Sequence, residues 1–186
     1  MDRELLKEEI ENAKQLETPH IERKERNKLI KETIKYYGDG TGKLNLLIVV
    51  EELAELQEEL IKYLDTNQFD IGLIEEAADV SIGLKCVKEI IFKDSWKDSL
   101  KEKTNEFYDK SKNETIINMI GWLSRLQQDI IKYLRQGETS KEIVDDYIKA
   151  KSVLKYLREY IIDEEDYRYA RDVKYNRQHK RNKKNK

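Results

Sequence analysis

Apolar residues recur every three or four positions along most of the chain, and no segment shows the strict alternation of a half-buried strand. This spacing predicts amphipathic helices. One proline and seven glycines leave few positions at which the chain must depart from a helix. We therefore predict an all-α fold, a helical bundle. The expected helices span 2–16, 19–37, 44–64, 71–92, 95–112, 113–136, 140–162 and 163–181.

Local signals set the ends of these helices. Thr18 and Pro19 are typical of an N-cap followed by a first-turn residue, and Gly137 is typical of a helix end. Further N-caps are expected at Ser95, Asn113 and Ser140. We predict a single domain over residues 1–186, in which residues 1–42 form N-terminal helices and residues 182–186 form a frayed basic tail.

An internal repeat organises the central helices. A shift of 70 residues places LAELQEELIKYL (53–64) over LSRLQQDIIKYL (123–134), with seven of twelve positions identical and no gap. The register persists across the loop that follows, which periodicity alone does not explain. We predict two helical hairpins related by duplication, at 44–91 and 114–161, with the chemically active copy first.

The glycine-rich loop GDGTGK (38–43) is superficially similar to a phosphate-binding P-loop. Its glycine spacing is one residue short, Leu44 stands in place of the Ser or Thr, and no strand precedes it. We interpret it as a linker.

Composition narrows the class of protein. Charged residues make up 40% of the 186 positions and hydrophobic residues 38%, so some burial can depend on the repeat or on a second subunit, and a homodimer stays open. Cys86 has no partner for a disulfide and is expected in the core. The charged N-terminus is unlike a signal peptide and no apolar run reaches the length of a membrane span, so we expect a cytoplasmic protein without a membrane partner.

Charge is unevenly distributed along the chain. Residues 168–186 hold nine Lys or Arg and one acid, a local charge of +8, so residues 1–167 carry −10. A basic terminus of this kind can bind phosphate backbones, although it is commonly only a solubilising end. With no base-reading module in the sequence, nucleic acid is disfavoured as a partner.

Two pairs of acidic residues are spaced three apart in the first hairpin. Glu52 and Glu55 lie on its first helix, Glu76 and Asp79 on its second, and each pair shares one helical face. At about 100° per residue, Glu76 and Asp79 share their face with small and apolar residues, so that face should be buried. Converging buried carboxylates repel one another and lose hydration, so a cation is expected between them.

Hard carboxylate ligands without nearby His or Cys favour Mg²⁺, with Mn²⁺ also possible. The alternative is a solvated acidic face, which is how we interpret the neighbours Glu51, Glu58, Glu59 and Glu75. Glu51 and Glu59 are nevertheless near enough to support the site. Lys62 is either a phosphate contact or a surface partner of Glu58.

The repeat provides an internal comparison for these acids. Under the 70-residue shift, the four carboxylates align with Trp122, Arg125, Asp146 and Lys149. Because the apolar frame persists where three of the four acids do not, we assign the carboxylates to chemistry.

The same residues carry a resemblance to a known family. EELAE (51–55) followed by EEAAD (75–79) resembles the EExxE and ExxD motifs of the all-α nucleoside triphosphate pyrophosphohydrolases, the MazG-like and dimeric dUTPase superfamily. The segment VKYNRQHKR (173–181) is similar to the closing KIDRQxxRI of single-repeat MazG-like proteins. The likeness covers 36–91 well and 155–181 loosely, and the degenerate second copy departs from one-repeat members.

The resemblance implies cleavage of a nucleoside triphosphate between its α and β phosphates, giving the monophosphate and pyrophosphate. By motif position it implies that Glu52, Glu55, Glu76 and Asp79 are catalytic ligands of Mg²⁺. Candidate substrate contacts are Asn45, Lys62, Lys174, Arg177 and Arg181. The competing hypotheses are a non-enzymatic helical protein that binds nucleic acid through its basic C-terminal tail, and a protein-interaction scaffold.

Overall fold

A computed structural model describes residues 3–92, 111–139 and 142–185. Over these residues the chain forms seven α-helices and one π-helical turn, with no strand, so the predicted all-α fold is confirmed. The elements are α1 Arg3–Gln15, α2 Arg23–Tyr36, α3 Lys43–Thr66, α4 Ile71–Val87, the π-helical turn η1 Lys88–Phe92, α5 Lys112–Gln136, α6 Glu142–Tyr160 and α7 Glu164–Lys184.

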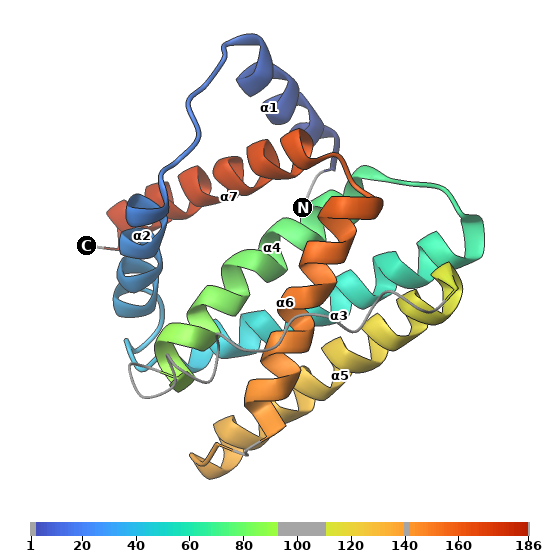
Figure 1. Ribbon diagram of the computed structural model, residues 1–186. Helices are drawn as coiled ribbons and strands as arrows, with labels where there is room; N and C mark the ends of the chain where they lie inside the picture. The colour runs from blue at the N-terminus through green and yellow to red at the C-terminus, as the bar shows by residue number, and fades with distance from the viewer. Residues whose placement is uncertain (1–2, 93–110, 140–141, 186) are drawn as a thin grey trace.

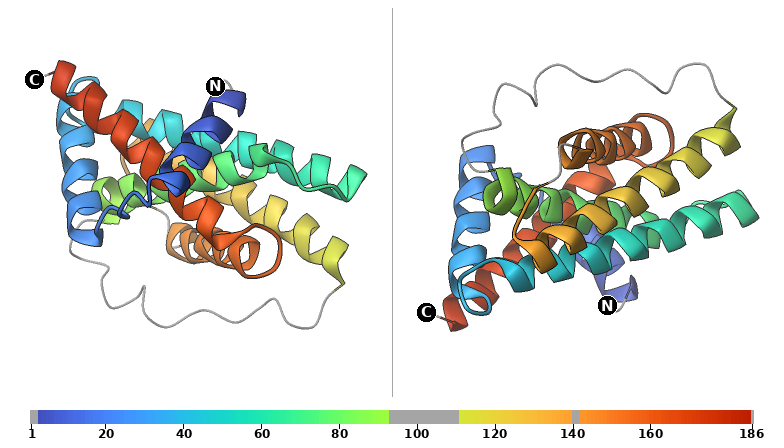
Figure 2. Two further views of the ribbon diagram at one scale, coloured as in Figure 1. Left: turned by 90° about the horizontal axis from the view of Figure 1, so that it is seen from above. Right: turned by 90° about the horizontal axis from the view of Figure 1, so that it is seen from below.

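Two antiparallel hairpins form the centre of the bundle (Figure 1). Helices α3 and α4 make the first and α5 and α6 the second, and α3 lies beside α5 in every view (Figures 1 and 2). Helix α7 packs against α4, and both α1 and α2 contact α7 and α4. The last helix of the chain is thereby brought to the first hairpin.

The core follows the predicted apolar faces. Leu53, Leu56 and Leu60 of α3 are fully buried, and so are Leu123, Leu126 and Ile130 at the equivalent positions of α5. Cys86 is buried, as predicted, and burial raises the pKa of its thiol to about 12. None of the helices in the described ranges combines the length and the hydropathy that a membrane-spanning segment requires.

The predicted start of the second helix is wrong. The Thr18 N–H donates to the Ala13 carbonyl at 2.9 Å and so closes α1 instead of starting a new helix. Residues 18–22 form no helix, because His20 and the Ile21 N–H both bond Asp172 of α7, at 2.7 and 3.2 Å, and α2 begins only at Arg23. This tether comes from the far end of the chain, so no local signal marks it.

The predicted cap of the fifth helix is also wrong. Ser111, not Asn113, caps α5, and it forms a capping box with Glu114. A Ser followed three residues later by Glu is the stronger signal, because two orphan backbone donors are satisfied at once. The helix predicted over 95–112 and the cap predicted at Ser140 lie outside the described residues.

The prediction that residues 182–186 form a frayed tail is also wrong for the part of the tail that the structure describes. Helix α7 continues to Lys184, and Asn182 is fully buried. Its Nδ2 donates to Thr33 Oγ1 of α2 at 3.0 Å. This tertiary hydrogen bond holds the last turns, whereas charge composition alone suggested fraying.

The helix bounds fit the 70-residue repeat. Shifting Lys43–Thr66 gives 113–136, which matches α5, and shifting Ile71–Val87 gives 141–157, within α6 to one residue. Gln57 and Gln127, which are equivalent under the shift, bond each other at 2.7 Å. The exposed apolar residues are equivalent too, Leu47 with Ile117 and Ile61 with Ile131. Duplication itself stays a prediction.

Candidate functional site

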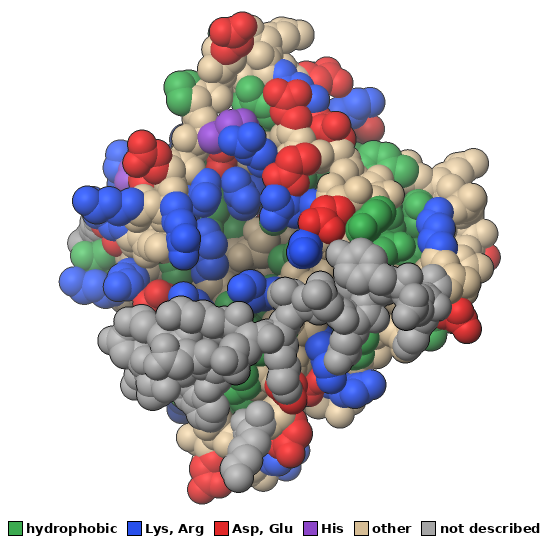
Figure 3. All heavy atoms as spheres, viewed as in Figure 1, with side chains coloured by type: hydrophobic (Ala, Val, Ile, Leu, Met, Phe, Trp, Pro, Cys, Tyr) green, Lys and Arg blue, Asp and Glu red, His purple; other side chains and the backbone are tan. Residues whose placement is uncertain are grey.

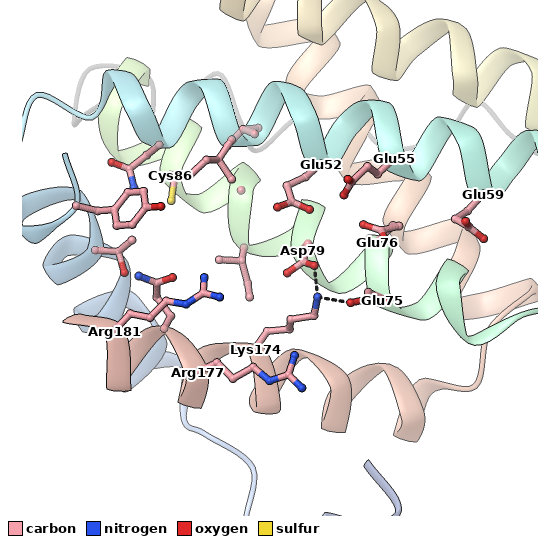
Figure 4. Close-up of a pocket in the computed structure, with 18 of the residues that line it drawn as sticks. Glu52, Glu55, Glu59, Glu75, Glu76, Asp79, Cys86, Lys174, Arg177 and Arg181 are labelled. Carbon is pink, nitrogen blue, oxygen red and sulfur yellow. Dashed lines mark hydrogen bonds and ion pairs between the residues drawn. The ribbon is translucent and has the colours of Figure 1, made fainter. Parts of the chain in front are cut away.

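A cavity of about 460 Å³ lies between α3, α4 and α7 (Figure 4). Carboxylates of α3 and α4 form one wall, and cationic side chains of α7 face them. The structure brings together at this cavity every site residue singled out from the sequence: Asn45, Glu52, Glu55, Lys62, Glu76, Asp79, Lys174, Arg177 and Arg181.

Close packing of α3 on α4 positions the acids. At Gly83, a Cβ atom would lie 3.0 Å from Val49 Cγ2, so only glycine allows this approach without displacement. One and two turns earlier on α4, Asp79 and Glu76 face Glu52 and Glu55 across the same helix pair. The three-residue spacing therefore directs both pairs toward one region.

Three of the four carboxylates form a compact set. Oxygen atoms of Glu52, Glu76 and Asp79 all lie within 4.8 Å of one another. Because Mg²⁺ binds oxygen at about 2.1 Å, ligands on opposite sides of one ion are about 4.2 Å apart. Small side-chain movements would therefore let a single ion touch all three. Glu55 is exposed and lies beside the set, outside this spacing.

The carboxylates are poorly compensated. Burial, followed by the charges of Asp79 and Glu55, raises the pKa of Glu52 to about 8 and that of Glu76 to about 9. Burial also raises the pKa of Asp79, against the opposing charge of Lys174. The buried Oε2 of Glu76 has no hydrogen-bond partner. Among the described residues, no ion pair neutralises Glu52, Glu55 or Glu76.

Lys174 stands as a counter-ion inside the site. Its buried ammonium group donates to Glu75 at 2.9 Å and also to Asp79 (Figure 4). Glu75 is only 3% exposed, so its interpretation as a solvent-facing charge was wrong. Helix α7 covers this face of α4, a contact that no local pattern around Glu75 could indicate.

Glu59 was also wrongly expected at the solvent-facing surface. It is 4% exposed and pairs with Arg3 of α1 and with Lys62, the latter at 2.8 Å. Lys62 also pairs with Glu58 at 2.9 Å, so the predicted i,i+4 partnership is present in a side chain that still lines the cavity. Arg3 is a cavity residue that the sequence gave no reason to choose.

The remaining candidate substrate contacts differ in their exposure and in the partners they have within the protein. Arg177 lies 3.1 Å from Glu9 of α1, whereas Arg181 lines the cavity from an exposed position on α7. Asn45 is 4% exposed, and its buried Oδ1 has no hydrogen-bond partner. Its neighbours along the wall, Ile48 and Val49, are apolar. The cavity therefore joins a cluster of acids to a region in which apolar side chains stand beside polar ones, among them Asn45, Tyr37 and Gln178.

The chain matches no protein-family model, no curated protein and no solved structure with which it was compared. The family resemblance of the two acidic motifs is therefore untested by these comparisons. What the site can do follows from its own geometry, in which acids able to hold a cation face basic groups able to hold an anion.

Proposed function

We propose that this chain is a divalent-metal-dependent nucleoside triphosphate pyrophosphohydrolase. The observation that carries the proposal is the set of Glu52, Glu76 and Asp79 oxygens within 4.8 Å, facing the cations of α7. Of these three acids, only Asp79 pairs with a basic group of the described residues, Lys174. Such a set suits Mg²⁺ or Mn²⁺, because hard cations bind carboxylate oxygens. Resemblance of EELAE and EEAAD to the superfamily motifs supports the same reaction.

The roles of the residues follow from their places. Glu52, Glu76 and Asp79 would hold the cation, with Glu55 near enough to orient a water molecule. A bound divalent cation supplies neutralisation of phosphate charge and a water molecule of lowered pKa. Arg181 and Lys62 would bind phosphate oxygens, since developing negative charge is stabilised by fixed cations.

Lys174 would change partner when a cation is present. Its ammonium group now neutralises Asp79 and Glu75. A cation on Asp79 would take over that neutralisation, leaving Lys174 available to a phosphate group. The same side chain thus stabilises the metal-free protein and serves the substrate.

Asn45 would contact the base. Its buried Oδ1 lacks a partner and lies beside Ile48 and Val49, a setting suited to a flat ring with an N–H at its edge. A cavity of about 460 Å³ falls in the size range of small-molecule sites. In this proposal the sugar and base would lie toward Asn45 and the phosphates toward the carboxylates.

The rival proposal of a free basic tail has less support. Lys174 is buried among acids, Arg177 lies against Glu9, and Asn182 is buried. These residues are committed to the bundle, so the C-terminal segment is not a separate basic extension.

Product analysis tests the proposal. A panel of ribo- and deoxyribonucleoside triphosphates would be incubated with Mg²⁺, and products would be separated by anion exchange. We expect monophosphate and pyrophosphate in equal amounts from at least one nucleotide. Release of diphosphate and phosphate, or no release at all, would refute it.

A matched pair of variants ties the activity to the site. Glu76→Gln should slow release about 100-fold, on the scale of losing one preorganised electrostatic contact. Asp146→Asn makes the same acid-to-amide change at the equivalent position of the second hairpin and should leave the rate unchanged.

A further inference from the structure

A second group of basic side chains lies away from the carboxylate cavity. In Figure 3, Lys and Arg side chains surround a hollow on the face that carries α2, α4, α6 and α7. We call this group the basic cluster; none of its members lines the carboxylate cavity. It comprises Arg23 and Arg26 of α2, Lys85 of α4, Lys88 of η1, Lys151 of α6 and Arg171 of α7.

These cations act on one another. Burial, together with the charges of Arg26, Arg171 and Arg23, lowers the pKa of Lys85 to about 8. Burial also lowers the pKa of Lys151, assisted by Lys88 and Arg23. Side chains from four helices and a turn are therefore held near enough to repel, which lowers stability unless an anion is present.

Within the described residues, the groups that these cations contact are mostly uncharged. Lys85 Nζ donates to the Tyr175 hydroxyl at 2.7 Å and lies 5.0 Å from the centre of that ring. The Arg26 guanidinium donates to the Ile21 carbonyl, and Arg171 lies over the Tyr167 ring at 5.4 Å. These contacts fix the cations in place without neutralising them.

One neighbouring acid is already engaged. Asp172 accepts from the Ile21 N–H and bonds His20 at 2.7 Å, while Arg171 Nε is 3.8 Å away. Over residues 3–92, 111–139 and 142–185, that contact is the one ion pair made by the cluster. The buried Nε atoms of Arg26 and Arg171 have no hydrogen-bond partner. The basic cluster thus has hydrogen-bond donors without acceptors and positive charge that is mostly not neutralised.

We propose that the basic cluster binds a compact multivalent phosphate anion, an oligophosphate either free or carried by a nucleotide. The cations come from four helices and one turn and lie close enough to repel one another, whereas a nucleic-acid strand requires basic groups that follow its backbone. Arginine forks and ammonium groups in fixed positions suit phosphate oxygens. This site does not depend on the hydrolase proposal.

Isothermal titration of the full chain with inorganic tripolyphosphate tests the inference. EDTA is included so that no metal recruits the anion to the carboxylates. Lys85→Met and the exposed Arg23→Gln should each weaken binding about tenfold, the loss of one charge-assisted contact. Lys132→Met, the same change at an exposed site on α5, should leave affinity unchanged.

Further arms separate the alternatives. Equal affinity in the parent, Lys85→Met and Arg23→Gln would overturn the inference. So would a loss of binding that follows Arg181→Gln instead, since the anion would then occupy the carboxylate cavity. Titration with a nucleoside triphosphate in EDTA distinguishes the two forms of the ligand. Tighter binding than that of tripolyphosphate indicates an oligophosphate carried by a nucleotide, and weaker binding indicates a free oligophosphate.

Tighter binding of a single-stranded oligonucleotide than of tripolyphosphate would overturn the inference and indicate nucleic acid as the ligand. Helical circular dichroism without anion checks each fold, and Arg23→Gln carries the test should Lys85→Met unfold, because Arg23 is exposed.

Discussion

The two hairpins bury equivalent apolar residues but carry opposite charges at several equivalent positions. Under the 70-residue shift, Glu55 and Asp79 of the first hairpin become Arg125 and Lys149 of the second. Glu76 becomes Asp146, whose pKa is raised by burial and Asp129 while Lys149 and Arg125 oppose the rise. The second hairpin therefore carries its own cations at positions where the first carries acids.

The carboxylates are not required for packing of the hairpin. The apolar frame of α3 and α4 recurs in α5 and α6 with residues such as the buried Trp122 in place of Glu52. A stable hairpin thus needs none of the extra acids. In the first hairpin the missing cations come from elsewhere, with Lys174 of α7 as one and, in our proposal, a metal ion as the other.

The largest expected effect is on stability when Lys174 is removed. Lys174→Met leaves Glu75 and Asp79 buried without a counter-ion, which should cost about 3–5 kcal/mol in the metal-free protein at pH 8. Lys149→Met in the second hairpin should cost about 1 kcal/mol or less, because that lysine is half-exposed. Urea unfolding measures both. Equal losses would mean that the two hairpins do not differ in their need for an outside cation.

A second prediction concerns a variant in which the first hairpin receives a charged residue of the second. Glu55→Arg installs the residue found at the equivalent position 125 and places a cation beside Glu76. Mg²⁺ should then bind about 10- to 100-fold more weakly, as occurs when groups supporting a metal site are lost. Thermal midpoints over a magnesium titration give the affinity. An unchanged magnesium response would show that Glu55 has no part in the site.

The third prediction concerns pH in the metal-free protein. The folded pKa values of Glu52 and Glu76, about 8 and 9, lie above the ordinary 4.5, so the folded state holds protons that the unfolded state has released. The free energy of unfolding should fall as pH rises from 4.5 through 9, by at most about 1.4 kcal/mol per pH unit for each carboxyl.

Glu76→Gln removes one of these groups and should flatten that decline, and saturating Mg²⁺ should reverse it. A parent protein that gains stability toward pH 9 without metal would contradict the assignment of buried, uncompensated acids.

The smallest effect is expected at the contact between the hairpins. Gln57 Nε2 donates to Gln127 Oε1, and Gln127 Nε2 donates to the Val50 carbonyl at 2.7 Å. Gln57→Leu and Gln127→Leu should each cost about 1 kcal/mol, and the double variant less than the sum, because the two side chains share a hydrogen bond. Full additivity in thermal unfolding would exclude this coupling.

Sequence periodicity was enough to predict that the chain is helical and that the four acids share helix faces, because both depend on spacing within a helix. The acids at 52, 55, 76 and 79 share faces that local geometry fixes. It could not supply the contacts between distant helices. The burial of Glu75 by α7, the pairing of Arg3 with Glu59, and the ordering of Asn182 by Thr33 all join segments more than 50 residues apart. The segment at Thr18 was mispredicted for the same reason, since its bonds to Asp172 keep it from forming a helix.

Direct binding of Mn²⁺ tests the central claim that Glu52, Glu76 and Asp79 form a metal site. Electron paramagnetic resonance would follow free Mn²⁺ during titration of the parent, Glu76→Gln and Asp146→Asn proteins. We expect the parent and Asp146→Asn to bind alike and Glu76→Gln to bind at least about tenfold more weakly. Equal binding by Glu76→Gln and the parent would contradict the claim.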